Sequence, residues 1–160
     1  MSESGRVPTV VVVDDNPAEL AEIKAFLETN TEFDVQTFTD SAEAERFFQV
    51  RRVDVAISDC DLAQTSGLQL LKRLKEIQPE SSRVLLAACL DPTIAAEAIN
   101  QVSLFQHLGK PWHDEQLLLA VRSGAERSRL LHELREKIEE LDSAHVTLKT
   151  VQQRLVHAFL

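Results

Sequence analysis

The sequence has no apolar run approaching the roughly 20 residues that a membrane-spanning helix needs. Its first residues show neither the basic nor the apolar region of a secretory signal peptide. We therefore expect no membrane association and a cytoplasmic location. The two cysteines, Cys60 and Cys89, stand alone without metal-ligand spacing, which favours reduced thiols over a disulfide or a metal site. Internal repeats and low-complexity segments are also absent.

Positive charge is scarce. The 160 residues include 17 Lys and Arg against 26 Asp and Glu, for a net charge of −9. Residues 121–160 hold seven basic and six acidic residues, so the remaining residues 1–120 carry −10. An acidic first part and a near-neutral tail exclude the basic surface on which direct nucleic-acid binding depends. The length is sufficient for one domain with a core of its own plus an extension.

Short β-branched runs alternate with amphipathic segments along the first two thirds of the chain. The pattern predicts strands at residues 9–13, 33–38, 53–58, 83–88 and 104–108, and helices at residues 17–28, 41–49, 66–77 and 92–100. Parallel neighbours need crossover connections, so five strands separated by helices predict a parallel sheet that is covered on both faces. The expected fold class is therefore a doubly wound α/β sandwich.

Three acids and one lysine stand at the ends of the predicted strands. Asp14 and Asp15 follow the first strand, Asp59 follows the third, and Lys110 follows the fifth. The carboxyl ends of parallel strands meet at one edge of the sheet, where open α/β folds bind ligands. Carboxylates gathered at such an edge repel one another unless a divalent cation neutralises them, and hard oxygen ligands suit Mg²⁺.

This constellation assigns a role to each residue. Asp14 and Asp15 are expected to hold the metal, while Asp59 ligates it and also acts as a nucleophile towards a phosphoryl group. Lys110 supplies a mobile positive charge to the phosphoryl oxygens. The backbone carbonyl of Asp61 is a further expected metal ligand. Helix capping or turn formation explains any one of these aspartates, but not three acids together with a lysine.

The motifs that hold these residues resemble a known family. VVVVDDN, VDVAISDCDLAQTSG and KPW together resemble the receiver domain of response regulators in two-component signalling, over about residues 7–122. The resemblance implies a flavodoxin-like sheet of strand order 2-1-3-4-5. It also implies phosphorylation of Asp59 by a histidine kinase or a phosphotransfer protein, with Mg²⁺ bound at Asp14 and Asp15.

The resemblance implies a phosphoacceptor signalling domain rather than an enzyme, although one able to catalyse its own phosphorylation and dephosphorylation. A phosphatase of the haloacid-dehalogenase type also uses strand-end aspartates and a lysine. Such a phosphatase has its DxD motif after the first strand and carries a cap domain. Here DCD follows the third predicted strand and no cap segment is present, which disfavours that alternative.

Two positions depart from the family pattern. Receivers usually have Thr or Ser at the end of the fourth strand, where its hydroxyl bonds the phosphoryl oxygen; this sequence has Ala87 there, or Ala88 if the register slips by one. The fifth-strand aromatic of the family is replaced by His107. A hydrogen bond to a charged group contributes about 1.5 to 3 kcal/mol, so we expect phosphoryl acceptance with weakened or rerouted switching. The alternative is a receiver-like dimerisation scaffold that does not switch.

The tail has the pattern of one long helix, about 70 Å long if residues 115–160 are helical throughout. Apolar residues recur in alternating steps of three and four, which is typical of a coiled coil. This stripe consists of Leu131, Leu134, Ile138, Leu141, His145, Leu148, Gln152, Leu155 and Phe159. No Pro or Gly interrupts residues 125–160, so a parallel homodimer is favoured over a helix that folds back on the domain.

The polar members of the stripe specify how two such helices pair. His145 and Gln152 at core positions fix the register at a cost in stability, and in a parallel pair Lys137 meets Asp142 of the other copy. We divide the chain into a receiver domain at residues 1–122 and a coiled-coil extension at residues 123–160 that continues the last receiver helix. The stripe runs to residue 160 without a C-cap, so we expect an output domain to follow.

Overall fold

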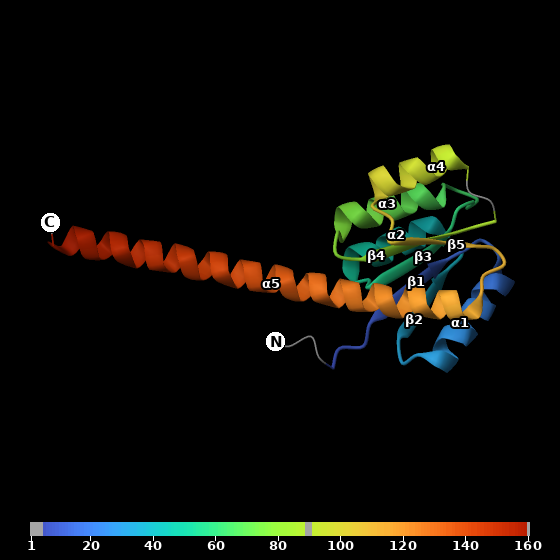
Figure 1. The fold of residues 1–160 in the computed structure, drawn as a ribbon, viewed down its shortest axis with the longest axis horizontal. Helices are drawn as coiled ribbons and strands as arrows, with labels where there is room; N and C mark the ends of the chain where they lie inside the picture. The colour runs from blue at the N-terminus through green and yellow to red at the C-terminus, as the bar shows by residue number, and fades with distance from the viewer. Residues whose placement is uncertain (1–4, 89–90, 160) are drawn as a thin grey trace.

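The computed structural model of the chain describes residues 5–88 and 91–159, in which strands and helices alternate (Figure 1). The strands are β1 (Thr9–Val13), β2 (Asp34–Phe38), β3 (Val55–Asp59), β4 (Ser82–Ala87) and β5 (Gln106–Gly109). The helices are α1 (Pro17–Asn30), α2 (Ser41–Val50), α3 (Gly67–Ile77), α4 (Pro92–Glu97) and α5 (Asp114–Phe159), with a π-helical segment η1 (Ala98–Val102) after α4.

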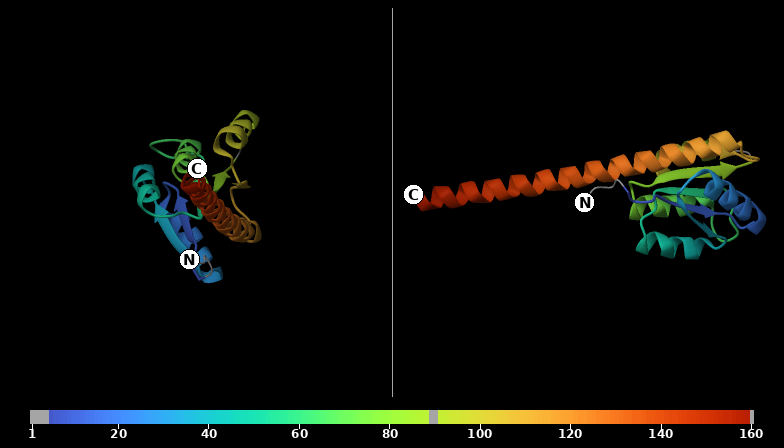
Figure 2. Two further views of the ribbon diagram at one scale, coloured as in Figure 1. Left: turned by 90° about the vertical axis from the view of Figure 1, so that its left-hand side faces the viewer. Right: turned by 90° about the horizontal axis from the view of Figure 1, so that it is seen from below.

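The five strands form one parallel sheet in the order β2-β1-β3-β4-β5. Helices α1 and α5 cover one face and α2 and α3 cover the other, as the views in Figures 1 and 2 show. The predicted doubly wound α/β fold and the strand order 2-1-3-4-5 are therefore confirmed.

The valine run of β1 fits its interior position in the sheet, between β2 and β3. Val10 and Val12 pack into the apolar cluster beneath α1 and α5, whereas Val11 and Val13 pack into the cluster beneath α2 and α3. Successive side chains of a strand point to opposite faces, so a strand covered on both sides must be apolar throughout. The same rule accounts for the buried run from Val84 to Leu86 in β4.

The predicted element boundaries differ from the structure most around β5. The strand begins at Gln106 instead of residue 104, and the predicted helix at residues 92–100 is divided into α4 and η1. The guanidinium of Arg83, which is buried, donates to the carbonyl oxygens of Val102 at 3.0 Å and Ser103 at 3.3 Å. These bonds hold the end of η1 against β4, and this delays the start of the strand.

Helix α5 is continuous over 46 residues, which corresponds to about 69 Å at 1.5 Å per residue. It begins at the carboxyl edge of the sheet, packs along its face through Leu117, Val121 and Ala125, and leaves at the opposite edge (Figure 1). All side chains of residues 134–156 are exposed. The predicted long C-terminal helix is confirmed. Among the described residues, no helix combines the length and apolar character that crossing a lipid bilayer requires.

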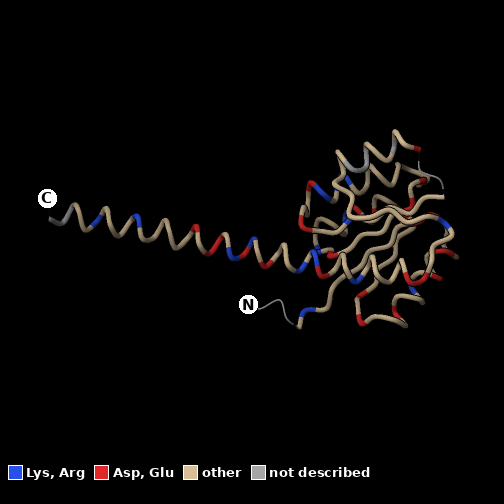
Figure 3. Tube along the Cα trace, viewed as in Figure 1, with Lys and Arg blue, Asp and Glu red and all other residues tan. Residues whose placement is uncertain are grey.

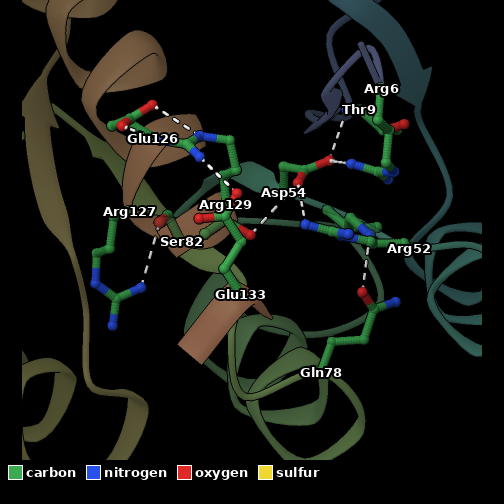
Figure 4. Close-up of polar contacts among 12 residues, drawn as sticks. Arg6, Thr9, Arg52, Asp54, Gln78, Ser82, Glu126, Arg127, Arg129 and Glu133 are labelled. Carbon is green, nitrogen blue, oxygen red and sulfur yellow. Dashed lines mark hydrogen bonds and ion pairs between the residues drawn. The ribbon is translucent and has the colours of Figure 1, made fainter. Parts of the chain in front are cut away.

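Polar contacts hold α5 where it leaves the sheet (Figure 4). Asp54, which precedes β3 and is 1% exposed, accepts hydrogen bonds from the Thr9 N–H at 2.8 Å and from Arg6 at 2.7 Å. The Ser128 hydroxyl of α5 lies 3.5 Å from the same carboxylate. Because packing and polar contacts continue past residue 122, the first part of the predicted extension lies on the sheet.

Replacing Asp54 with alanine is expected to lower the free energy of unfolding by about 2 kcal/mol, because it leaves a buried N–H and a partly buried guanidinium without their acceptor. Urea unfolding followed by circular dichroism measures the change. Asp34→Ala is the matched control, since its ion pair with Arg51 is exposed and is expected to contribute less than about 1 kcal/mol. Equal losses in the two variants would contradict a structural role for Asp54.

Candidate functional site

Three aspartates meet at the carboxyl edge of the sheet. Asp14 and Asp15 follow β1, Asp59 ends β3, and these two strands are hydrogen-bonded neighbours. Each of the three side chains offers a carboxylate oxygen within 4.8 Å of the others. The structure thus brings together the three acids that the sequence assigned to metal binding.

Lys110 completes this group from the other side. It follows β5, and its backbone N–H donates to the Ala87 carbonyl at 3.1 Å. Its ammonium nitrogen lies 3.1 Å from Asp59 Oδ2 and 3.3 Å from Asp14 Oδ2. A third carboxylate, that of Glu19, lies closer still, at 2.7 Å. The predicted lysine therefore reaches the predicted aspartates.

Glu19 is a site residue that the sequence analysis missed. Asn16 caps α1 by accepting hydrogen bonds from the N–H groups of Ala18 and Glu19, and Pro17 is the first helical residue. Glu19 therefore lies in the first turn, directly beside the strand end that carries Asp14. An acid in a first turn is usually explained by the helix dipole alone. The sequence does contain a signal for its position: Asn16 and Pro17, which start the helix, follow the aspartate pair directly, so the first turn has to lie close to Asp14.

The site carries more negative charge than its lysine can balance. Burial raises the pKa of Asp14 to about 6, and a hydrogen bond with Glu19 acts in the same direction, against the effects of the Asn16 N–H and Lys110. Burial lowers the pKa of Lys110, but hydrogen bonds to Glu19 and Asp59 outweigh it and hold the pKa above its usual value. The site thus offers oxygen ligands, excess negative charge and, in Asp14, a carboxyl group whose raised pKa disfavours its charged form. These properties suit the binding of a hard divalent cation.

The loop after β3 is held to the neighbouring strand β4 and is closed by a hydrogen bond between its own two ends. The Cys60 N–H donates to the Leu86 carbonyl and the Gly67 N–H donates to the Cys60 carbonyl, each at 2.8 Å. Asp61 pairs with Ser66 in an isolated antiparallel bridge, and its side chain is exposed. Its predicted role as a carbonyl ligand stays a prediction.

Of the two cysteines, only Cys60 lies within the described residues. Cys60 is a free, half-buried thiol, and burial raises its pKa with further help from Asp61 and Asp59, which disfavours a reactive thiolate. Cys89 lies outside the described residues, so the predicted state of that thiol stays a prediction.

Ala87 and Ala88, the two alternatives for the position that carries a hydroxyl in the family, lie at the same edge of the sheet as the acids. Ala87 is the last residue of β4 and is buried, whereas Ala88 is exposed and lines a groove together with Lys110 and Trp112. Neither side chain carries a hydroxyl. His107 lies on β5 and is exposed. The hydroxyl is therefore missing at either predicted register, and only Ala88 lines the groove.

The stripe predicted to pair two helices lies on the exposed part of α5. Leu131 is half-buried against the domain, and the stripe residues from Leu134 to Leu155 are exposed, including His145 and Gln152. Basic and acidic residues are interspersed on the part of this segment nearer the domain, whereas the part nearer the C-terminus carries basic residues without acids, as Figure 3 shows. Lys137 lies 3.5 Å from Glu140 of its own helix. The side chain of Phe159 lies outside the described part of the structure.

Together, the parallel sheet of order 2-1-3-4-5 and the three acids beside a lysine at its carboxyl edge define a flavodoxin-like α/β domain with an acidic cluster that could hold a metal ion. The model of the response regulator receiver domain family matches residues 10–122. The chain belongs to that family, as the sequence motifs indicated.

Similar proteins and structures support this assignment. The chain is 27% identical over 156 residues to the hydrogenase transcriptional regulatory protein HoxA of Cupriavidus necator, covering 97% of this chain and 32% of that protein. It is 28% identical over 121 residues to the transcriptional regulatory protein GlrR of Escherichia coli, covering 74% and 26%. The chain thus spans a third or less of the length of these relatives.

Solved receiver structures are similar over nearly their whole length. The signal receiver domain of an HD domain-containing protein from Pseudomonas fluorescens has a TM-score of 0.72 at 32% identity, covering 77% of this chain and 98% of that one. A response regulator receiver domain protein from Clostridium thermocellum has a TM-score of 0.71 at 29% identity, covering 78% and 99%. The similarity leaves much of the extended helix unmatched.

Proposed function

We propose that this receiver accepts a phosphoryl group on Asp59 from a histidine kinase or a phosphotransfer protein and signals through its C-terminal helix. The observation that carries the proposal is the position of Lys110, whose ammonium nitrogen lies 3.1 Å from Asp59 Oδ2 and 3.3 Å from Asp14 Oδ2. A nucleophilic carboxylate, a neighbouring acid pair and a mobile cation are the groups that phosphoryl transfer to an aspartate requires.

In the proposed reaction, an Asp59 carboxylate oxygen attacks the phosphorus atom of a phosphohistidine. The new P–O bond forms as the P–N bond breaks, and the electron pair stays on the imidazole nitrogen, which takes up a proton. The contact of Lys110 with the Asp59 carboxylate is then replaced by hydrogen bonds to the phosphoryl oxygens, whose charge it balances. Later attack by water on phosphorus releases phosphate and restores Asp59.

Magnesium fits the residues of the site. Asp14, Asp15 and Asp59 would hold Mg²⁺ through carboxylate oxygens, together with the backbone carbonyl of Asp61. The bound ion supplies positive charge that offsets the phosphoryl oxygens. The support is the acid cluster itself, in which three carboxylates converge and the pKa of Asp14 is raised to about 6 by burial and then by its hydrogen bond with Glu19.

The C-terminal helix is proposed to transmit the state of the receiver at residues 1–122 to an output domain. Residues 123–160 are proposed to pair with the same segment of a second copy as a parallel coiled coil, since their apolar stripe is exposed. The relatives carry names of transcriptional regulators, and a comparable output is part of this proposal. The receiver itself is proposed to act in the cytoplasm, without touching nucleic acid or membrane directly.

The direct test is modification with acetyl phosphate and Mg²⁺, followed by intact mass measurement. We expect a single phosphoryl adduct on the full chain, none on Asp59→Asn, and an unchanged adduct on Asp61→Asn, because the side chain of Asp61 is exposed and only its backbone is assigned a role. An Asp59→Asn variant that is modified as fast as the unchanged chain would refute the proposal.

A second candidate is a receiver-like dimerisation scaffold that does not switch. The observation that favours it is the lack of a hydroxyl at both Ala87 and Ala88, of which Ala88 lines the groove beside Lys110. Hydrogen exchange with and without beryllofluoride separates the two candidates. A scaffold binds this phosphoryl analogue with no change in α5, whereas a switching receiver alters the exchange of helix amides.

A further inference from the structure

The shortest contact of the Lys110 ammonium group involves Glu19, which belongs to neither the aspartate cluster nor the predicted site. Glu19 Oε2 lies 2.7 Å away, against 3.1 Å for Asp59 and 3.3 Å for Asp14. The Glu19 side chain is 33% exposed, whereas those of Asp59 and Asp14 are 14% and 2% exposed. Glu19 is therefore the partner of Lys110 that water reaches most easily.

The Lys110 ammonium group already has three acidic neighbours. An ammonium group carries three N–H donors, and three carboxylates surround this one. A phosphoryl group on Asp59 would bring further oxygens that require the same donors. The donor that now faces Asp59 can serve one of these oxygens, and a second donor becomes available only when Lys110 releases Asp14 or Glu19. Of these two carboxylates, the more exposed one regains hydration at the lower cost. That carboxylate is Glu19.

We propose that Glu19 is a positioning residue that holds Lys110 and competes for it with the phosphoryl oxygens. Glu19 thereby weakens the contact of Lys110 with a phosphoryl group on Asp59. This inference rests on the proposed function, because it concerns the same lysine and the same phosphoacceptor. Asn16 and the first turn of α1 fix the position of Glu19, so the contact is part of the fold.

The chain offers a matched control. Glu22 lies one turn further along α1 and lines the same groove as Glu19, Lys110 and Trp112. Among the contacts of residues 5–88 and 91–159, none joins Glu22 to Lys110. Glu22→Gln therefore removes the same charge from the same groove and leaves Lys110 with its carboxylates.

The experiment is a titration of the full chain with beryllofluoride at saturating Mg²⁺, followed by the fluorescence of Trp112, the only tryptophan. Glu19→Gln is expected to tighten beryllofluoride binding about 3-fold to 10-fold. The reason is that the partly exposed ion pair of Glu19 with Lys110 no longer competes with the bound beryllofluoride for the lysine. Glu22→Gln is expected to change it less than about 2-fold. Magnesium affinity without beryllofluoride is expected to stay within about 2-fold in both variants.

A double-mutant cycle tests whether the effect passes through the lysine. In a Lys110→Ala background, Glu19→Gln is expected to have no more effect than Glu22→Gln. Equal behaviour of the two glutamine variants in the unchanged background would overturn the inference, and so would an effect of Glu19→Gln that persists without the lysine or that weakens magnesium binding in parallel. If the unchanged chain itself gives no response to beryllofluoride, the proposed function fails instead.

Discussion

Replacing Gly67 with alanine is expected to lower the free energy of unfolding by about 3 kcal/mol and to displace Asp59 from its position beside Lys110. A Cβ atom at Gly67 would overlap the carbonyl oxygen of Asp59 and would lie 2.9 Å from both its carbonyl carbon and Ser58 Oγ. The obstacle is mainly backbone, so no rotamer change relieves it. Either α3 or the end of β3 has to move.

The usual advantage of alanine does not offset this cost. Gly-to-Ala changes stabilise a compatible site by about 0.4 to 1 kcal/mol, mainly through the entropy of the unfolded chain. The overlap with Asp59 is expected to cost several times more. Urea unfolding measures the stability, and titration with beryllofluoride and Mg²⁺ reports the site. We expect weaker binding of the analogue together with the loss of stability.

Gly109→Ala is the matched control for Gly67→Ala. Gly109 is next to Lys110, yet a Cβ built on it has no neighbouring atom within 4 Å among the described residues. This variant is expected to keep both its stability and its response to beryllofluoride. If the free energy of unfolding of Gly67→Ala stays within about 0.5 kcal/mol of that of the unchanged chain, the loop after β3 can move at little cost. The overlap with Asp59 would then not explain the glycine at this position.

The sequence pattern predicted the interior strands and the position of the acids, because both depend on residues that are close together in the chain. Val10 to Val13 are apolar without interruption because both faces of β1 are covered, and the aspartates that follow them must then lie at the sheet edge. In the same way, the spacing of apolar residues in α5 follows from the period of a single helix.

Features that depend on contacts between side chains far apart in the sequence could not be predicted in this way. Glu19 and Lys110 are 91 positions apart, and their contact depends on how α1 approaches β5. The late start of β5 depends on the buried guanidinium of Arg83, whose acceptors lie 19 and 20 residues further along the chain. No periodicity encodes such pairs, so their effects become visible only in the folded chain.

Helix α5 raises the question of how a helix can extend so far without a covering surface. Over residues 134–156 every side chain is exposed, and several are large and apolar. Packing of an apolar face, rather than helix propensity, stabilises most protein helices. The exposed stripe is therefore the basis of the proposed pairing, in which a second copy of the same helix supplies the complementary pattern at every position.

Leu141→Glu is expected to convert the proposed dimer into a monomer. Leu141 is a member of the stripe and is 70% exposed in the single chain, so the substitution leaves the fold of the receiver unaffected. A buried leucine contributes about 2 kcal/mol, and each of the two chains loses one. The association constant is then expected to fall about 1000-fold or more, a change that sedimentation or light scattering detects.

Val146→Glu is the control for this substitution, because Val146 is similarly exposed, at 63%, but lies off the stripe. It introduces the same charge into the same helix and is expected to leave the dimer intact.

The direction of pairing is tested by a disulfide cross-link. With both native cysteines replaced by serine, Leu134→Cys is expected to form a disulfide between the two copies. A parallel pair places the two Leu134 positions together, whereas an antiparallel pair places them toward opposite ends of the stripe. A dimer that survives Leu141→Glu, or one in which this cysteine fails to cross-link, would contradict the parallel coiled coil while leaving phosphorylation of Asp59 unaffected.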